Sequence, residues 1–541
     1  MKKTYYIVLC FAALFLTSCK DYLTAPEPGV TKLEDYYSSG QACINNVNGC
    51  YVPLMWEFSS TYCCEWFIGD VMSDDALKGG QNLNDMKAAY DLENWRTVSN
   101  NDIAYDVWRA NFYGIARCNL ALNYIPDVAT DSIMTPSVKA RLIGEAKFLR
   151  AYYYFRLLRI YGGVPLSLGV ITDEANWAMP RASVEEVFNA IVADLKDAEG
   201  GLWNKSEYPV SELGRATKGA AQAMLMKTYL YMASTYWNKQ ISLSADKCYE
   251  QAHIWGEKLM QAAEAGEYSL CPNYADNFTL EGENGPESIF EIQYVEEETS
   301  DYGGKEGGFG ATRGTFTIIL TRSRSSQMGK GWGFNKPTRN LYDEYEAGDP
   351  RRDATILNPE DSLIDNKEEE IYLGSRYLSR KYALYLNENG TQVAKLAHDT
   401  RGAINNKQIR LADAYLMYAE ACLGTGDEGT AKTYINKVRD RVGLPHVGEY
   451  SITVNGETIA NPTVEQCLKH ERRMELAMEG HRWFDLVRYG NTKAHMDAYK
   501  ATEDPKAQAE MNEFITGVHE LLPIPSKERQ LNTALTQNNG Y

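Results

Sequence analysis

Apolar residues recur at the spacing of an α-helix along much of the chain. The segment 40–55 shows this clearly, because one stripe of it carries Ala42, Ile44, Val47, Tyr51 and Leu54. Residues three, four or seven positions apart lie on one face of a helix, so this spacing predicts an amphipathic helix. The same periodicity predicts further helices at about 101–125, 137–161, 245–265, 408–423 and 427–441.

Several of these helices carry recognisable start and stop signals. Ser183 followed by Glu186 forms a capping box, in which each side chain bonds the backbone of the other, and it predicts a helix from position 184. Thr217 is placed to cap another helix. Gly162 and Pro165 end the helix predicted at 137–161, since glycine adopts the left-handed conformation and proline cannot continue a helix.

Two stretches, 56–100 and 267–401, lack a sustained helical period. The second is rich in Gly, Asp and Asn, and we expect in it only short strands, at Ser288–Tyr294 and Thr315–Leu320. Helices joined by short connections at 101–161, 183–237 and 408–441 resemble tetratricopeptide units. The predicted fold class is therefore mainly α, a tetratricopeptide-like helix-pair scaffold decorated with long loops and short strands.

The first residues resemble a bacterial lipoprotein signal. Lys2 and Lys3 precede twelve almost wholly apolar residues, Tyr5–Leu16, a length suited to a signal peptide and too short to span a bilayer. Leu16-Thr17-Ser18-Cys19 then resembles a lipobox. We expect residues 1–18 to be removed, Cys19 to be lipidated and residues 19–32 to form a tether. The alternative is an ordinary secretory signal with a chance cysteine.

The charge of the chain argues against nucleic acid as a partner. The 541 residues include 73 acidic and 55 basic ones, a net charge of −18, and loss of the two signal lysines makes it −20. A protein of this sign repels phosphate backbones. Beyond the N-terminal signal, no segment reaches about 18 consecutive apolar residues, so we expect no membrane-spanning helix.

The cysteines and acidic residues suggest no metal centre. Nine cysteines remain after Cys19, an odd number without a C-x-x-C pair, and a disulfide among Cys43, Cys50, Cys63 and Cys64 stays open. The acidic run 70–75 could hold calcium but lacks the spacing of an EF-hand, so we favour helix capping or solvated charge. We expect no cofactor, with structural calcium as the alternative.

Several longer motifs resemble the SusD/RagB family of outer-membrane nutrient-uptake lipoproteins. The most specific is ERRMELAMEGHRWFDLVRYG at 471–490, and the lipobox belongs to the same pattern. Other motifs occur in the order typical of the family: AKFLRAYYYFRLLRIYGGVPL at 146–166, RASVEEVFNAIVADLKDA at 181–198, GRATKGAAQAMLMKTYLY at 214–231, DPRRD at 349–353, IRLADAYLMYAEA followed by INKVRDRVGLP within 409–445, LLPIPSKER at 521–529 and the closing QNNGY.

This resemblance implies one SusD-like fold, with its N-terminal helical part at 33–266 and a loop-rich middle and C-terminal helical part at 267–541. It also implies a lipid-anchored protein on the outer face of the outer membrane. Such a protein captures an oligosaccharide and delivers it to a SusC-like TonB-dependent barrel transporter. The alternatives are a peptide-binding protein of the RagB type and a protein scaffold that binds no such ligand.

Ligand-binding residues do not follow from the resemblance, because the family's sites lie in variable loops. A Tyr or Trp ring offers a flat platform for the C–H face of a sugar. We therefore choose aromatic residues in the polar loops. The candidates are Trp332, Trp95, Trp66, Tyr294, Tyr302 and Phe334. Trp332 is the first of these because glycines flank it, and the alternative for each is that it anchors its own loop. Trp108, Trp237, Trp255 and Trp483 fall on helical patterns and are expected in the core.

The sequence gives no sign of catalysis. It contains no H-E-x-x-H, G-x-S-x-G or P-loop motif, and His470-Glu471 lacks the second histidine because position 474 is Met. The charges from Glu471 to Arg488 alternate in sign at helical spacing, which predicts structural ion pairs. A carboxylate pair for glycoside hydrolysis has no sequence signature of its own, so the family resemblance is what disfavours an enzyme.

Overall fold

The computed structural model describes residues 37–173, 177–296, 305–310, 313–324, 331–358, 373, 375–382, 398 and 400–541. The predicted signal peptide, Cys19, the tether and Tyr302 lie outside these residues. Within them, no helix is both long and apolar enough to cross a bilayer.

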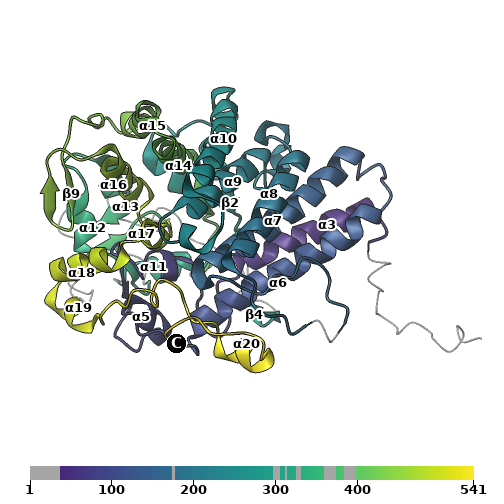
Figure 1. Ribbon diagram of the computed structural model, residues 1–541, viewed down its shortest axis with the longest axis horizontal. Helices are drawn as coiled ribbons and strands as arrows, with labels where there is room; N and C mark the ends of the chain where they lie inside the picture. The colour runs from purple at the N-terminus through teal and green to yellow at the C-terminus, as the bar shows by residue number, and fades with distance from the viewer. Residues whose placement is uncertain are drawn as a thin grey trace, which may run out of the picture.

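The predicted helices form the body of the molecule (Figure 1). The long ones are α3 (Gly40–Tyr51), α6 (Asp102–Tyr124), α7 (Pro136–Tyr161), α8 (Val184–Gly201), α9 (Lys218–Ala233), α10 (Ala245–Glu264), α14 (Leu411–Gly424), α15 (Glu428–Arg441) and α16 (Val464–Leu476). From α6 to α10 each helix packs on the next, and α10 packs on α14, which pairs with α15. The mainly α fold is confirmed.

The predicted caps are present. Ser183 accepts from the Glu186 amide while Glu186 accepts from the Ser183 amide, which completes the capping box of α8. The side chain of Thr217 accepts from the Ala220 amide at the start of α9. Such caps satisfy amides that have no partner within the helix, and each contributes about 1 kcal/mol to stability.

Shorter elements fill the loop-rich stretches. The helices are α4 (Trp66–Gly69), α5 (Lys87–Glu93), α11 (Thr317–Thr321), α12 (Arg339–Glu344), α13 (Pro350–Thr355), α17 (Arg482–Tyr489), α18 (Thr492–Thr502), α19 (Pro505–Glu510) and α20 (Ser526–Leu531). The strands are β1 (Ala76–Gly79), β2 (Ser288–Ile292), β3 (Lys305–Glu306), β4 (Phe309–Gly310), β5 (Phe334–Pro337), β6 (Ile356–Leu357), β7 (Leu378–Ser379), β8 (Asn406–Arg410), β9 (Ile452–Val454) and β10 (Glu457–Ile459).

All strand pairs among the described residues are antiparallel and two-stranded: β1 with β5, β2 with β8, β3 with β4, β6 with β7, and β9 with β10. The strand predicted at Ser288–Tyr294 is confirmed as β2. The strand predicted at Thr315–Leu320 is wrong, because this segment forms the short buried helix α11. A continuous apolar run of this length is compatible with either structure, and its neighbours decide between them.

The core contains the four tryptophans predicted for it. Trp108, Trp237, Trp255 and Trp483 are all buried. All nine cysteines among the described residues are also buried and free, so none of the four proposed for a disulfide is bridged in the structure. Small buried thiols pack like apolar residues.

A network of buried ion pairs surrounds α16. Glu475 contacts Arg351, Arg410 and Arg441, which come from α13, the end of β8 and α15. Glu471, one turn earlier, contacts Arg351 and also pairs with Arg439 at 2.7 Å. The structural ion pairs predicted for 471–488 are therefore confirmed, and they reach further along the chain than helical spacing alone indicates.

The acidic run 70–75 belongs to the same network. Asp70, Asp74 and Asp75 are fully buried, so the expectation of solvated charge is wrong. Arg473 contacts both Asp74 and Asp75, at 3.0 and 2.9 Å, and Arg482 bonds Asp74 at 2.8 Å. Sequence spacing did not indicate this role because the partners lie about 400 positions away.

Removal of Glu475 tests the network. Burial by itself would raise the pKa of this carboxyl, but Arg441, Arg410 and Arg351 hold it well below its usual range. Glu475→Ala leaves these buried guanidinium groups short of a partner, so we expect a loss of about 3–5 kcal/mol in the free energy of unfolding by urea denaturation.

The matched control is Asp343→Ala, which breaks the exposed i,i+4 pair of Arg339 and Asp343. This change should cost less than about 1 kcal/mol, because solvent screens exposed pairs. Equal losses in the two variants would contradict a stabilising role for the buried network.

Candidate ligand-binding site

Aromatic side chains on and beside the loop 56–63 contact rings from two other parts of the chain, the segment before β5 and helix α6. Phe58 and Tyr62 form an isolated antiparallel bridge in this loop, and their rings lie 4.9 Å apart. Trp332 packs edge-on against Tyr62 at 5.3 Å. Tyr113 of α6 is 40% exposed and packs edge-on against Trp56 at the base of the loop. We call Phe58, Tyr62, Tyr113 and Trp332 the aromatic platform.

The position of Trp332 is fixed by its backbone. Its amide donates to the Ile319 carbonyl at 2.9 Å, and the Gly333 amide donates to the Arg322 carbonyl at 2.8 Å. Gly331 lies so close to Arg322 that a Cβ atom on it would come within 2.2 Å of the arginine Cβ. The glycine next to Trp332 therefore permits this close pairing with the segment after α11.

Arg109 of α6 joins the loop to the β3–β4 hairpin, which lies beside α6 (Figure 1). Its guanidinium donates to the Gly307 carbonyl at 2.6 Å and contacts Asp106 at 3.2 Å. It also lies over the ring of Phe309 at 5.0 Å, and Phe309 stacks on Trp56 at 4.7 Å. This cation–π contact and these hydrogen bonds place a polar group beside the platform.

Hydrogen bonds to the side chain of Glu57 hold the loop 56–63 in place. This buried carboxylate accepts hydrogen bonds from Tyr294 at 3.0 Å, from Thr315 at 2.9 Å and from the Phe316 amide at 2.6 Å. Burial raises the pKa of Glu57, although these hydrogen bonds act in the opposite direction. The loop 56–63 is thus bonded to segments more than 200 positions away.

The six predicted ligand residues have different surroundings. Trp66, Trp95, Tyr294 and Phe334 are at most 5% exposed. Trp66 donates to Thr317 at 3.1 Å, and Trp95 packs edge-on against Phe514. This placement favours the loop-anchoring alternative for the buried four. Tyr302 lies outside the described residues, and Trp332 is half-buried on the platform.

The platform includes residues that sequence reasoning missed. Phe58, Tyr62 and Tyr113 were not among the candidates. Tyr113 stands on a helical pattern, which suggested packing, and the loop aromatics had no flanking glycine to mark them. The nearest sequence signal is the polar Ser59-Ser60-Thr61 between two aromatic residues. Among the described residues, no group of three or more His, Cys, Asp or Glu side chains is arranged to hold a metal ion.

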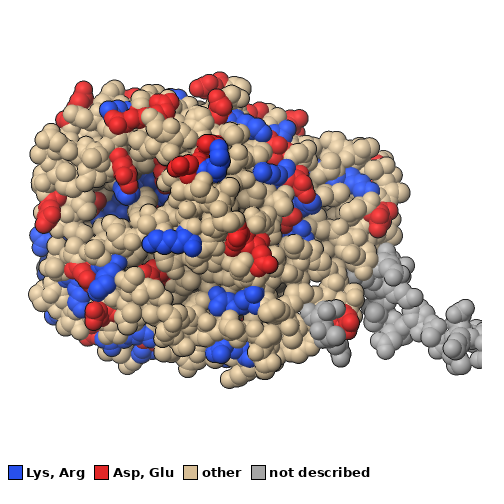
Figure 2. Space-filling model, in the orientation of Figure 1, with Lys and Arg blue, Asp and Glu red and all other residues tan. Residues whose placement is uncertain are grey.

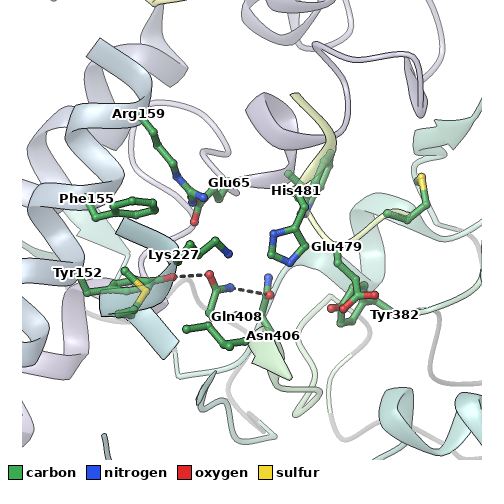
Figure 3. A pocket seen from close by; sticks show the side chains of 15 residues that line it. Glu65, Tyr152, Phe155, Arg159, Lys227, Tyr382, Asn406, Gln408, Glu479 and His481 are labelled. Atoms are coloured by element: carbon green, nitrogen blue, oxygen red, sulfur yellow. Dashed lines mark hydrogen bonds and ion pairs between the residues drawn. The ribbon is translucent and has the colours of Figure 1, made fainter. Parts of the chain in front are cut away.

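An enclosed polar cavity is a second place where functional groups meet (Figure 3). The ammonium group of Lys227 and the ring of His481 point into it from opposite sides. Gln408 accepts a hydrogen bond from Tyr152 and donates one to Asn406 at 2.8 Å, and all three residues line the cavity. The cavity volume of about 20 Å³ holds roughly one water molecule, so this space does not admit a sugar or a peptide.

The protonation of His481, which lines this cavity, makes the free energy of unfolding depend on pH. Burial, followed by the charge of Lys227, lowers the pKa of His481 from 6.5 to about 3. Below pH 6.5 the unfolded chain takes up a proton at this position while the folded chain does not. Stability contributed by the neutral ring is therefore complete above pH 6.5 and is lost as the pH falls towards 3.

We expect this loss to disappear in His481→Gln. Between pH 5.5 and 4, the unfolding free energy of the unmodified protein should fall more steeply than that of the variant, by about 1.4 kcal/mol per pH unit for one proton. Urea denaturation at several pH values measures the slopes. His446→Gln, at an exposed position, is the control and should keep the original slope. If the unfolding free energy of His481→Gln fell with pH as steeply as that of the unmodified protein, the lowered pKa of His481 would be contradicted.

Comparisons with known proteins agree with this architecture. A family model described as SusD family matches residues 286–541, and one described as "Starch-binding associating with outer membrane" matches residues 41–230. SusD-like protein P38 of Formosa agariphila is 25% identical over 513 residues, which are 90% of this chain and 92% of that protein. The starch-binding protein SusD of Bacteroides thetaiotaomicron is 25% identical over 456 residues, 75% of this chain and 74% of that protein.

Solved structures show the same fold. A laminarin binding SusD-like protein has a TM-score of 0.75 and 27% identity, covering 93% of this chain and 100% of that one. Surface glycan-binding protein A from Bacteroides thetaiotaomicron, in complex with laminarihexaose, has a TM-score of 0.73 and 22% identity with the same coverage. One family model covers most of the N-terminal half of the chain, and the other covers nearly all of the C-terminal half. The chain therefore belongs to the SusD/RagB family.

Proposed function

We propose that this protein binds an oligosaccharide on its aromatic platform at the cell surface and passes it to a SusC-like TonB-dependent barrel transporter. The observation that carries the proposal is the platform itself, a set of half-buried rings beside a polar guanidinium group. A related protein with 27% identity binds laminarin, a glycan, which supports a ligand of this class.

The chemistry of the platform suits a sugar chain. The C–H face of a sugar ring stacks on an aromatic face, while hydroxyl groups need donors and acceptors nearby. Tyr113 is 40% exposed and Trp332 is half-buried, so each leaves part of its ring accessible, and Arg109, whose side chain is 20% exposed, supplies N–H donors. Transfer to a transporter requires release of the cargo, so modest affinity is compatible with this role.

We further propose that the protein is held in the outer membrane by lipid on Cys19 and that it does not hydrolyse its ligand. The lipobox supports the anchor, and acylation by more than one chain suffices for stable attachment. Membership of a family of binding proteins supports the second point. Binding screens on residues 20–541 with glycans and peptides distinguish an oligosaccharide ligand from a peptide or from no ligand.

Trp332→Ala tests the platform. Loss of the ring should weaken binding of laminarihexaose about tenfold, which equals about 1.4 kcal/mol, as measured by calorimetric titration. If laminarihexaose does not bind, the glycan identified by the screen takes its place. Trp332→Phe keeps an aromatic face and should retain most of the affinity.

The matched control is Trp177→Ala, which removes a 52% exposed tryptophan from the connection between α7 and α8. This variant should bind as the unmodified protein does. Unchanged affinity in Trp332→Ala would remove the platform from the binding site. New reducing ends after incubation with the glycan would show hydrolysis instead of simple binding.

Cys19→Ala tests the anchor. Without a thiol to carry the lipid, the protein should leave the membrane fraction and should not incorporate labelled palmitate. Cys43→Ala, which changes another cysteine near the N-terminus, should remain in the membrane fraction after a salt wash. Retention of Cys19→Ala in that fraction would show that the anchor is elsewhere.

A further inference from the structure

A second hollow lies on the C-terminal part of the molecule, and no residue of the aromatic platform lines it. It is formed where the ends of α9, α14 and α17 meet the N-terminal turn of α16, and its volume is about 440 Å³. This lies within the usual range of small-molecule sites, about 300–1,000 Å³. Figure 2 shows the surface hollowed between the positions of α14, α16 and α17, with basic side chains inside the hollow.

One wall of this hollow is the ring of Tyr249, from the first turn of α10. The ring rests directly on Gly424 at the end of α14, where an added Cβ atom would come within 2.1 Å of the ring. Tyr249 is half-buried, so part of its ring borders the hollow.

Tyr489, the last residue of α17, also lines the hollow. Lys469 and Arg488 each lie 4.5 Å from the centre of its ring. The end of α17 packs closely on the segment after α9, because the Tyr236 amide donates to the Arg488 carbonyl at 3.3 Å. These contacts hold the second ring in place.

The charges around the hollow are already paired. Arg488 contacts Glu420 and Asp485, Lys469 contacts Glu465 at 2.6 Å, and Glu428 contacts Lys432 at 2.7 Å. The lining contains the carboxylates of Glu420, Glu428 and Glu465 against the cations of Lys469 and Arg488. An anionic ligand would meet more negative than positive charge, so the lining favours a neutral ligand with many hydroxyl groups.

The hollow continues beyond the N-terminal turn of α16. A neighbouring space of about 410 Å³, bordered by the β9–β10 hairpin, shares Thr463, Glu465, Lys469 and Tyr489 with it. The Glu465–Lys469 pair between the two spaces is solvent-exposed, and such pairs rearrange at little cost. The two spaces adjoin along these shared residues, and we call them together the groove. Two adjoining spaces of this size suit a chain of several units better than a single small molecule.

We propose that this groove is a second carbohydrate-binding site, which takes a neutral oligosaccharide with one sugar unit stacked on Tyr249. The hydroxyl groups of Thr235 and Thr463 and the carboxylates of Glu420 and Glu428 provide donors and acceptors for the hydroxyls of the sugar. The proposal does not depend on the aromatic platform, since the two surfaces share no residue.

The test fills the groove with a larger side chain at a position on its lining. Thr235 is exposed, lines the groove and also packs on Gly490, so Thr235→Trp should occupy the space while its folding is verified separately. Lys239→Trp adds the same side chain at a nearby exposed position that does not line the groove. Calorimetric titrations with laminarihexaose, maltohexaose, xylohexaose and mannohexaose measure the number of sites and their affinity. Circular dichroism verifies folding.

For at least one of these sugars we expect two binding events in the unmodified protein. Thr235→Trp should remove one of them, Lys239→Trp should retain both, and Trp332→Ala should weaken the other. Tyr249→Ala should weaken the groove event at least tenfold, which tests the site even if Thr235→Trp does not fold.

The proposal is overturned if none of the four sugars shows an event that is sensitive to Thr235→Trp or Tyr249→Ala. If Thr235→Trp removes a binding event and Trp332→Ala changes none, the groove is supported and the aromatic platform is contradicted. The reverse result would support the platform alone, so the two proposals fail separately.

Discussion

Buried ion pairs around α16 and α17 hold together parts of the chain that are remote in sequence. Arg473 bonds Asp75, 398 positions away, and Arg410 joins Glu287 to Glu475 and Glu479. A buried charge without its partner is far more costly than a surface one, so each of these contacts strongly disfavours other arrangements of the chain. Helix packing forms the layers, and the network fixes how the loop-rich segments lie on them.

This fixed arrangement matters for the two candidate binding surfaces. The loop carrying Phe58 and Tyr62 is bonded through the buried Glu57 to segments beside α11, so its rings need little ordering when a ligand arrives. Preorganised surfaces lose less entropy on binding than flexible ones. In the second groove, Gly424 and the cations around Tyr489 hold the rings in a similar way.

The two surfaces differ in a way that suggests a division of labour. The platform is aromatic, which suits stacking on sugar rings. The groove is lined by charges that are paired with one another. Two separate sites on one chain would raise the local concentration of a long glycan even if each site bound weakly. Under the proposed function, in which the ligand is released to a transporter, this combination would be an advantage.

The sequence by itself determined the helices, their caps, the buried tryptophans and the family, because helical periodicity, capping and family motifs are local properties that need no knowledge of the fold. It did not determine the role of Asp74 and Asp75, since a carboxylate in a loop looks the same whether water or a distant arginine neutralises it. It also did not separate the buried Trp66 and Trp95 from the half-buried Trp332, nor find Phe58, Tyr62 or Tyr249. Exposure of an aromatic ring depends on which distant segments cover it, and only the tertiary structure decides that.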